Sequence, residues 1–147
     1  MPQLHATCVA VDGLGVLIRG PSGSGKSDLA LLLIDAGARL VADDRCDVAV
    51  ADGRPVARAP EAIAGLLEVR GLGILRLEAL AAAPVGLVVD LVDQDRPERL
   101  PEPATTAVAG IPVPLLRLYG RAPSAAAKVR LAVALARGGV ETVEAVR

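Results

Sequence analysis

The fold of this chain is decided by residues 15–44, which read GVLIRGPSGSGKSDLALLLIDAGARLVADD. Residues 15–19 are mostly apolar, as in a strand, and residues 26–36 carry leucines at helical spacing. Gly37 suits the end of this helix, and residues 39–42 form a short apolar strand that ends at two carboxylates. Strand, glycine-rich loop, helix and strand in this order predict a βαβ unit within an α/β fold with a mixed sheet.

The loop in this stretch matches the complete pattern of a phosphate-binding P-loop. Its residues are Gly20, Pro21, Ser22, Gly23, Ser24, Gly25, Lys26 and Ser27. Glycines let backbone N–H groups turn toward a phosphate, and the helix that follows adds its N-terminal amides. The lysine places a charge on the β- and γ-phosphates, and the last serine offers a hydroxyl to Mg²⁺. The pattern therefore predicts binding of ATP with Mg²⁺, most simply in a kinase, rather than a glycine turn that only caps a helix.

A kinase also needs carboxylates for the metal and for a general base, and three acidic sites compete for these roles. Asp43 and Asp44 end the strand after the helix, Asp90 ends the apolar run 87–89, and Glu68 precedes a glycine-rich stretch. Each also has a structural interpretation: a loop cap, a solvated strand end, or an ion pair with Arg70. The spacing alone leaves the choice open.

The remaining sequence predicts short elements that complete one domain over residues 1–147. They are a strand over 5–11, a hairpin over 47–58 around Asp52-Gly53, a short helix over 61–67, a buried strand over 85–92 and a helix over 124–137 that starts at Ser124. Asp12-Gly13 is expected to join 5–11 to 15–19 as a hairpin that leads into the P-loop. Residues 93–114 contain five prolines, which predict loops and edge segments.

Composition and charge restrict the function further. The net charge is -1, the sequence pI is about 5.8, and no basic stripe is visible, which argues against a nucleic-acid partner. The N-terminus shows no signal peptide, and Gly, Pro or Asp interrupt each apolar stretch before it could span a membrane. Cys8 and Cys46 are too few for a disulfide framework. A soluble cytoplasmic protein with free thiols is the expectation.

Three segments together resemble the catalytic domain of the HPr kinase/phosphorylase family. They are His5-Ala6-Thr7, the stretch 15–44, and the run EVRGLGI over residues 68–74. The chain is similar to a short form that has the catalytic domain alone. The resemblance implies a fold like that of phosphoenolpyruvate carboxykinase, a homo-hexamer, and ATP-dependent phosphorylation of a serine of the phosphocarrier protein HPr in the phosphotransferase system.

The resemblance also implies catalytic roles for individual residues. Asp44 matches the aspartate that takes the proton from the substrate serine, and Asp43 matches its supporting neighbour. Lys26 matches the P-loop lysine, and Arg99 in PERLP matches an active-site arginine. His5 matches a histidine near the phosphates, whereas the residues alone favour an ordinary strand or surface histidine.

Metal and phosphate roles follow in the same way. Ser27 and Glu68 match the family's Mg²⁺ positions. Family members that also remove the phosphate carry a PGRN-like element near the C-terminal helix, but residues 111–128 read IPVPLLRLYGRAPSAAAK, where Arg117 and Arg121 do not fit that pattern. The sequence therefore predicts a kinase whose phosphorylase activity is doubtful. A small-molecule P-loop kinase and a nucleotide-gated regulatory module are the alternatives.

Overall fold

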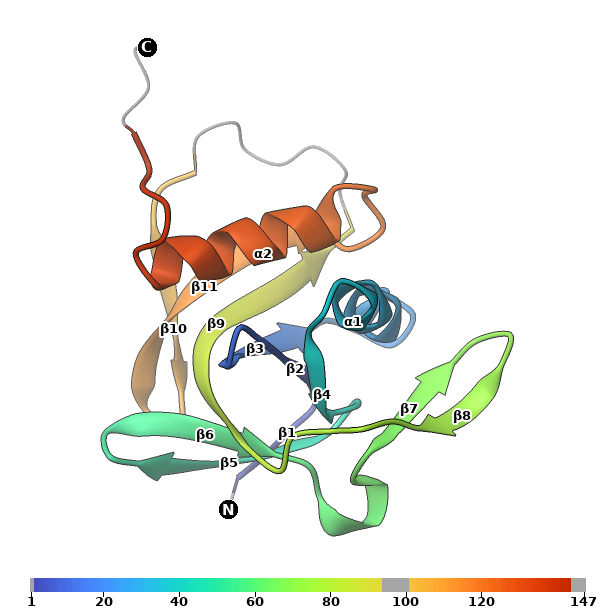
Figure 1. Ribbon diagram of the computed structural model, residues 1–147. Coiled ribbons are helices and arrows are strands. Elements are labelled where there is room, and N and C mark those ends of the chain that lie inside the picture. Colours follow the sequence, from blue (N-terminus) through green and yellow to red (C-terminus); the bar gives the residue numbers. More distant parts are fainter. Residues whose placement is uncertain (1, 94–100, 144–147) are drawn as a thin grey trace.

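The computed structural model describes residues 2–93 and 101–143, which form a curled mixed sheet with two helices on one face and a separate two-stranded sheet within residues 66–76 (Figure 1). The helices are α1 (Lys26–Asp35) and α2 (Ala125–Ala136). The strands are β1 (Gln3–Leu4), β2 (Thr7–Val11), β3 (Leu14–Arg19), β4 (Arg39–Ala42), β5 (Cys46–Ala51), β6 (Arg54–Arg58), β7 (Leu66–Val69), β8 (Gly73–Arg76), β9 (Ala83–Val92), β10 (Ala104–Val108) and β11 (Ile111–Tyr119). Within these residues, no helix is long and apolar enough to cross a membrane.

The P-loop lies at the edge of the sheet that is formed by the carboxyl ends of the parallel strands. The main path runs β1-β5-β6-β9-β3-β2-β4, and β11 joins β9 and carries β10. Strands β3, β9 and β11 run parallel to one another, so their carboxyl ends share one edge. The P-loop leaves the end of β3 at this edge and leads into α1, whereas β4 is separated from β3 by β2. The βαβ unit therefore forms with one strand inserted between its two strands.

Long β9 holds the two halves of the sheet together. Its start pairs with β6, and its later residues pair with β3 on one side and β11 on the other. Successive residues of the neighbouring strand β3 point to opposite faces of the sheet and pack in two different hydrophobic clusters. Val16 and Ile18 pack with α1 and α2, whereas Leu17 packs with β5 and β6 on the other face. The P-loop is thus anchored by a strand that is buried on both faces.

The structure confirms several of the expected elements. Strands β2 and β3 form the hairpin around Asp12-Gly13, and β5 and β6 form the hairpin around Asp52-Gly53. Helix α1, helix α2, strand β4 and strand β9 also form where the sequence predicts them. Ser124 occupies the N-cap position of α2, although its side chain makes no capping hydrogen bond.

Two expectations were wrong. The helix over 61–67 is only a 3₁₀ turn over Glu61–Ile63, because Gly65 takes a left-handed φ of +77° and residues from Leu66 onward form β7. Residues 104–108 and 111–119 form a strand pair, so the expected loops were wrong there, whereas the expected edge segments agree with β10, which pairs with β11 alone. Pro112 and Pro114 are tolerated there because that half of β11 pairs with β10 alone, and only the later half pairs with β9.

Candidate functional site

The P-loop adopts a conformation that requires its glycines. Gly23 has a φ of +81° and Gly25 a φ of +100°, both in the left-handed region that disfavours other residues. The Ser24 N–H donates to the Pro21 carbonyl at 3.0 Å, which closes the tip of the loop. Helix α1 begins directly after Gly25, so the N–H groups of its first turn, which have no partner within the helix, face the loop. This arrangement is suited to hold phosphate oxygens.

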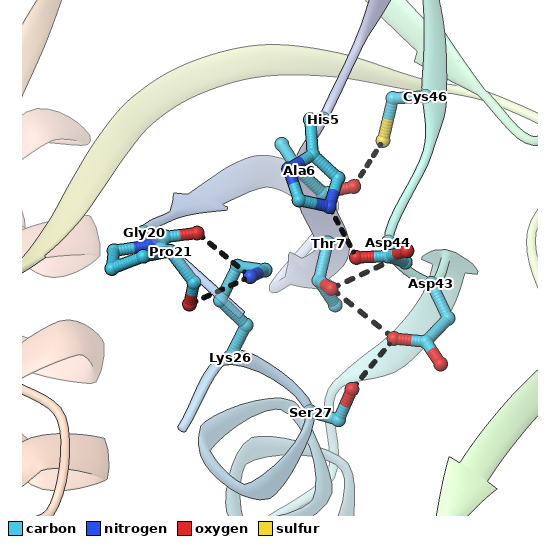
Figure 2. Close-up of polar contacts among 10 residues, drawn as sticks. All are labelled: His5, Ala6, Thr7, Gly20, Pro21, Lys26, Ser27, Asp43, Asp44 and Cys46. Atoms are coloured by element: carbon cyan, nitrogen blue, oxygen red, sulfur yellow. Dashed lines mark hydrogen bonds and ion pairs between the residues drawn. The ribbon is translucent and has the colours of Figure 1, made fainter. Parts of the chain in front are cut away.

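Lys26 is folded over this loop and is almost completely buried. Only 7% of the residue is exposed, and its Nζ donates to the carbonyl oxygens of Gly20 at 2.7 Å and Pro21 at 3.2 Å (Figure 2). The charged end of Lys26 therefore contacts two neutral carbonyl groups of the loop that precedes α1. Phosphate oxygens that entered the loop would be better partners for an ammonium group than these carbonyls.

Asp43 connects the P-loop to the sheet. One carboxylate oxygen accepts hydrogen bonds from Ser27 Oγ at 2.9 Å and from Thr7 Oγ1 at 3.1 Å. The other oxygen accepts the backbone N–H of Glu68 at 3.1 Å. The carboxylate of Asp43 therefore links the Ser27 hydroxyl at the start of α1 to the backbone of β7.

Asp44 lies beside it, with its carboxylate facing solvent. Its Oδ1 is 2.7 Å from Nε2 of His5, and the two side chains are 58% and 55% exposed. The backbone of Asp44 has a φ of +66°, and its N–H donates to Thr7 Oγ1 at 3.0 Å. An exposed carboxylate that is held in a strained conformation beside an imidazole is suited to accept a proton from an incoming group.

Thr7 is the residue that sequence reasoning missed. It is completely buried, and its hydroxyl donates to Asp43 while it accepts from Asp44, so it fixes both aspartates. Figure 2 shows His5, Asp44, Thr7, Asp43 and Ser27 as one hydrogen-bonded chain. A buried threonine at the start of a strand otherwise lined by apolar side chains was the available signal.

The competing carboxylate, Asp90, is already engaged. Its two oxygens accept from Nε and Nη2 of Arg19 at 2.7 and 3.0 Å, across the aligned strands β3 and β9. This hydrogen-bonded contact with Asp90 raises the pKa of Arg19 above its usual value. The pair fixes the end of β3 just before the P-loop and leaves Asp90 poorly suited to hold a metal.

The oxygen atoms around Ser27 fit Mg²⁺ chemically, because Mg²⁺ prefers oxygen ligands and keeps several waters. Ser27 Oγ faces Asp43, and Asp43 also contacts the backbone of Glu68, whose side chain is exposed. In residues 2–93 and 101–143, no group of three or more His, Cys, Asp or Glu side chains forms a metal site by itself. Arg99 lies outside the described residues.

Two buried thiols support the strands behind the site. Cys46 Sγ donates to the carbonyl of Ala6 at 3.4 Å, next to Thr7. A hydrogen bond with the Cys46 thiol, together with burial, raises the pKa of Cys8 well above its usual value. Both cysteines are free, so they act here as small core residues rather than as nucleophiles.

Comparison with known proteins places this geometry in a family. The HPr kinase/phosphorylases of Clostridium beijerinckii and Clostridium perfringens are 50% and 51% identical over 78 residues, which is 53% of this chain but only 26% and 25% of theirs. The structure of the Hpr(Ser) kinase/phosphatase from Coxiella burnetii superposes with a TM-score of 0.77 at 26% identity, covering 95% of this chain and 90% of that one. The family model of the HPr serine kinase C-terminal domain matches residues 1–119. The chain therefore belongs to the HPr serine kinase C-terminal domain family.

Proposed function

We propose that this protein is an ATP-dependent kinase that phosphorylates a serine of an HPr-type phosphocarrier protein in the cytoplasm. The observation that carries the proposal is the hydrogen-bonded chain that runs from His5 through Asp44, Thr7 and Asp43 to Ser27. It ties an exposed candidate base to the loop that would hold the nucleotide. The names of the relatives support the choice of HPr as the substrate.

In this proposal, several residues of the chain have separate roles in phosphoryl transfer. Asp44 accepts the proton from the substrate serine, and His5 holds the Asp44 carboxylate through their 2.7 Å contact. The serine oxygen then bonds to the γ-phosphorus of ATP as the bond to the β-phosphate oxygen breaks, so that ADP leaves. Lys26 exchanges its carbonyl partners for phosphate oxygens and stabilises the negative charge that develops during transfer.

Ser27 and Glu68 are the proposed Mg²⁺ positions. Asp43 lies between them, because its carboxylate accepts from the Ser27 hydroxyl and from the Glu68 N–H. It would be a third oxygen ligand, either directly or through water. When bound, Mg²⁺ would supply positive charge that offsets the negative charge of the phosphates.

Exposure of the candidate base favours a protein substrate over a small molecule. More than half of the Asp44 and His5 side chains is open to solvent. A small acceptor would need a pocket that encloses it and excludes water. A serine on a folded protein does not need such a pocket, because the docked protein itself shields the reacting groups from water. An exposed aspartate at this edge therefore suits docking of HPr.

The test is a transfer assay with labelled ATP, Mg²⁺ and purified HPr. Asp44→Asn should reduce labelling of HPr by at least about 100-fold, since general base catalysis contributes on that scale. Asp52→Asn is the matched control, because Asp52 is also exposed and has a similar φ of +53°. It should retain full activity.

The outcomes of this assay distinguish the alternatives. Label that appears only on a metabolite would establish a small-molecule kinase. Tight binding of ATP without any transfer would favour a nucleotide-gated regulatory module. Full activity of the Asp44→Asn variant would remove Asp44 from the role of base.

We also propose that phosphorolysis is weak or absent, because residues 111–128 lack a recognisable PGRN-like element. Phosphorylated HPr, incubated with the enzyme, Mg²⁺ and millimolar phosphate, should release pyrophosphate far more slowly than HPr is phosphorylated. Comparable rates in the two directions would refute this part of the proposal.

Assembly into a homo-oligomer, a hexamer by resemblance, would cover apolar surface near the site. Leu72 and Ile74 on the β7–β8 hairpin are 74% and 70% exposed, and Figure 1 shows this hairpin projecting from the body of the molecule. Light scattering should show an oligomer that dissociates when both residues are changed to serine. A monomeric parent protein at working concentration would contradict the proposal.

A further inference from the structure

The turn between β11 and α2 places a second cation on the P-loop. Arg121 lies in this turn, and its Nη2 donates a hydrogen bond to the carbonyl oxygen of Gly23. Its Cγ is 3.9 Å from the point that a Cβ at Gly25 would occupy. The arginine side chain therefore lies along the two glycines whose left-handed conformations shape the loop.

The backbone before Arg121 is packed tightly against the loop. A Cβ at Gly120 would come within 2.9 Å of the Leu91 side chain and 3.2 Å of the Ser24 carbonyl oxygen, so only glycine fits there without displacement. The Ala122 N–H donates to the Tyr119 carbonyl at 3.1 Å and closes the turn. Packing and this turn consequently hold the backbone at Arg121 next to the loop, independently of the hydrogen bond that its side chain donates to Gly23.

The partner of Arg121 is weak compared with what its guanidinium can bind. A guanidinium has five N–H donors, and the neutral Gly23 carbonyl is the one acceptor that Arg121 reaches within the described residues. Arg19, by contrast, forms a bidentate pair with Asp90. Lys26 and Arg121 are thus two cations at one loop that both contact neutral carbonyls, which are weaker partners for a cation than an anion would be.

We propose that Arg121 binds the terminal phosphate of the nucleotide held by the P-loop, and that it exchanges the Gly23 carbonyl for phosphate oxygens when the nucleotide binds. This inference rests on the proposed nucleotide-binding function of the loop. A planar guanidinium forms two parallel hydrogen bonds to a phosphate, which a carbonyl cannot match. Arg121 would then add to the single charge that Lys26 provides in the P-loop motif.

Equilibrium binding of ATP, ADP and AMP with Mg²⁺, measured by calorimetry, tests the assignment. Arg121→Gln keeps an N–H donor for the Gly23 carbonyl but removes the charge, whereas Arg121→Lys keeps the charge. Arg130→Gln is the control, because Arg130 is exposed on α2 and its side chain makes no hydrogen bond in the described structure.

Arg121→Gln should weaken ATP binding about 10- to 100-fold and AMP binding less than about threefold, since hydrogen bonds to charged groups contribute on that scale. Arg121→Lys should restore part of the ATP affinity. The difference between parent and Arg121→Gln should shrink as salt is added, because salt screens an exposed charge. Arg130→Gln should bind all three nucleotides like the parent.

The possible failures are distinguishable. Equal ATP affinity of the parent and Arg121→Gln overturns the role of Arg121. An equal loss for ATP, ADP and AMP overturns it too, because Arg121 would then only support the loop. If the parent protein binds no nucleotide, both the proposed function and the proposed ligand of Arg121 are refuted. If the nucleotides bind as expected but HPr is not phosphorylated, the assignment of Arg121 stands and the proposed substrate is refuted.

Discussion

Replacing Thr7 with valine removes one hydroxyl and keeps the shape of the side chain. Thr7 is completely buried, and valine puts a methyl group of similar size in place of the hydroxyl, so the change creates no large cavity and tests mainly the hydrogen bonds. The Asp43 carboxylate loses a donor at 3.1 Å but keeps Ser27 and the Glu68 N–H. The Asp44 N–H loses its acceptor at 3.0 Å.

The expected loss of stability is about 2–3 kcal/mol in the free energy of unfolding. A hydrogen bond to a charged group is worth about 1.5–3 kcal/mol, and an unpaired buried N–H costs about 1–3 kcal/mol. The sum is reduced because Asp43 retains other donors and water reaches the exposed side of Asp44. The Thr7 hydroxyl also helps to hold Asp44 at its left-handed φ of +66°, a conformation that costs roughly 1–3 kcal/mol.

Urea denaturation measures the stability, and transfer to HPr measures the function. Thr7→Ser is the matched control, because it keeps the hydroxyl and loses a methyl group worth about 1 kcal/mol. Thr7→Val should also slow transfer about 10- to 100-fold, since a displaced Asp44 no longer meets the substrate serine. If Thr7→Val is more stable than Thr7→Ser, or transfers phosphate as fast as the parent, the reasoning about this hydroxyl is refuted.

Two further substitutions test the loop and the choice among carboxylates. Lys26→Ala should lower phosphoryl transfer by about 1000-fold, because it removes a charge aimed at the reacting phosphates; turnover within a few-fold of the parent would show that the P-loop assignment is wrong. Asp90→Asn should lower the free energy of unfolding by about 1 kcal/mol through loss of the half-buried pair with Arg19, while a Mg²⁺ titration of transfer should match that of the parent. A shift of the Mg²⁺ midpoint by more than about tenfold would return Asp90 to the metal site.

The sequence was sufficient to predict the elements around the P-loop. The glycines of residues 20–25 permit few backbone conformations, and a helix must follow them to complete the phosphate site. The Asp-Gly pairs at 12–13 and 52–53 predicted both hairpins, because this dipeptide favours the tight turn that joins antiparallel strands. Local conformational preference determines all of these features.

Features that depend on strand order could not be predicted in the same way. Pro112 and Pro114 indicated loops, yet they lie in β11 because one side of that strand faces no partner there. Asp90 resembled a metal ligand until the alignment of β3 with β9 placed Arg19 beside it. Neither fact is encoded within the segments themselves, since both arise from which strands become neighbours.

The described site also shows how the P-loop stays folded despite its concentration of polar groups. Lys26 contacts carbonyl oxygens and Ser27 contacts Asp43, so the two side chains that would meet a phosphate and a metal already have partners within the protein. In the proposed function, nucleotide binding exchanges the hydrogen bonds of these two side chains rather than adding to them, and the net gain for each exchanged bond is small. The side chains therefore contribute affinity mainly where a charged acceptor replaces a neutral one. The cations at Lys26 and Arg121 gain most from such a replacement, because both contact neutral carbonyl groups in the protein as it stands.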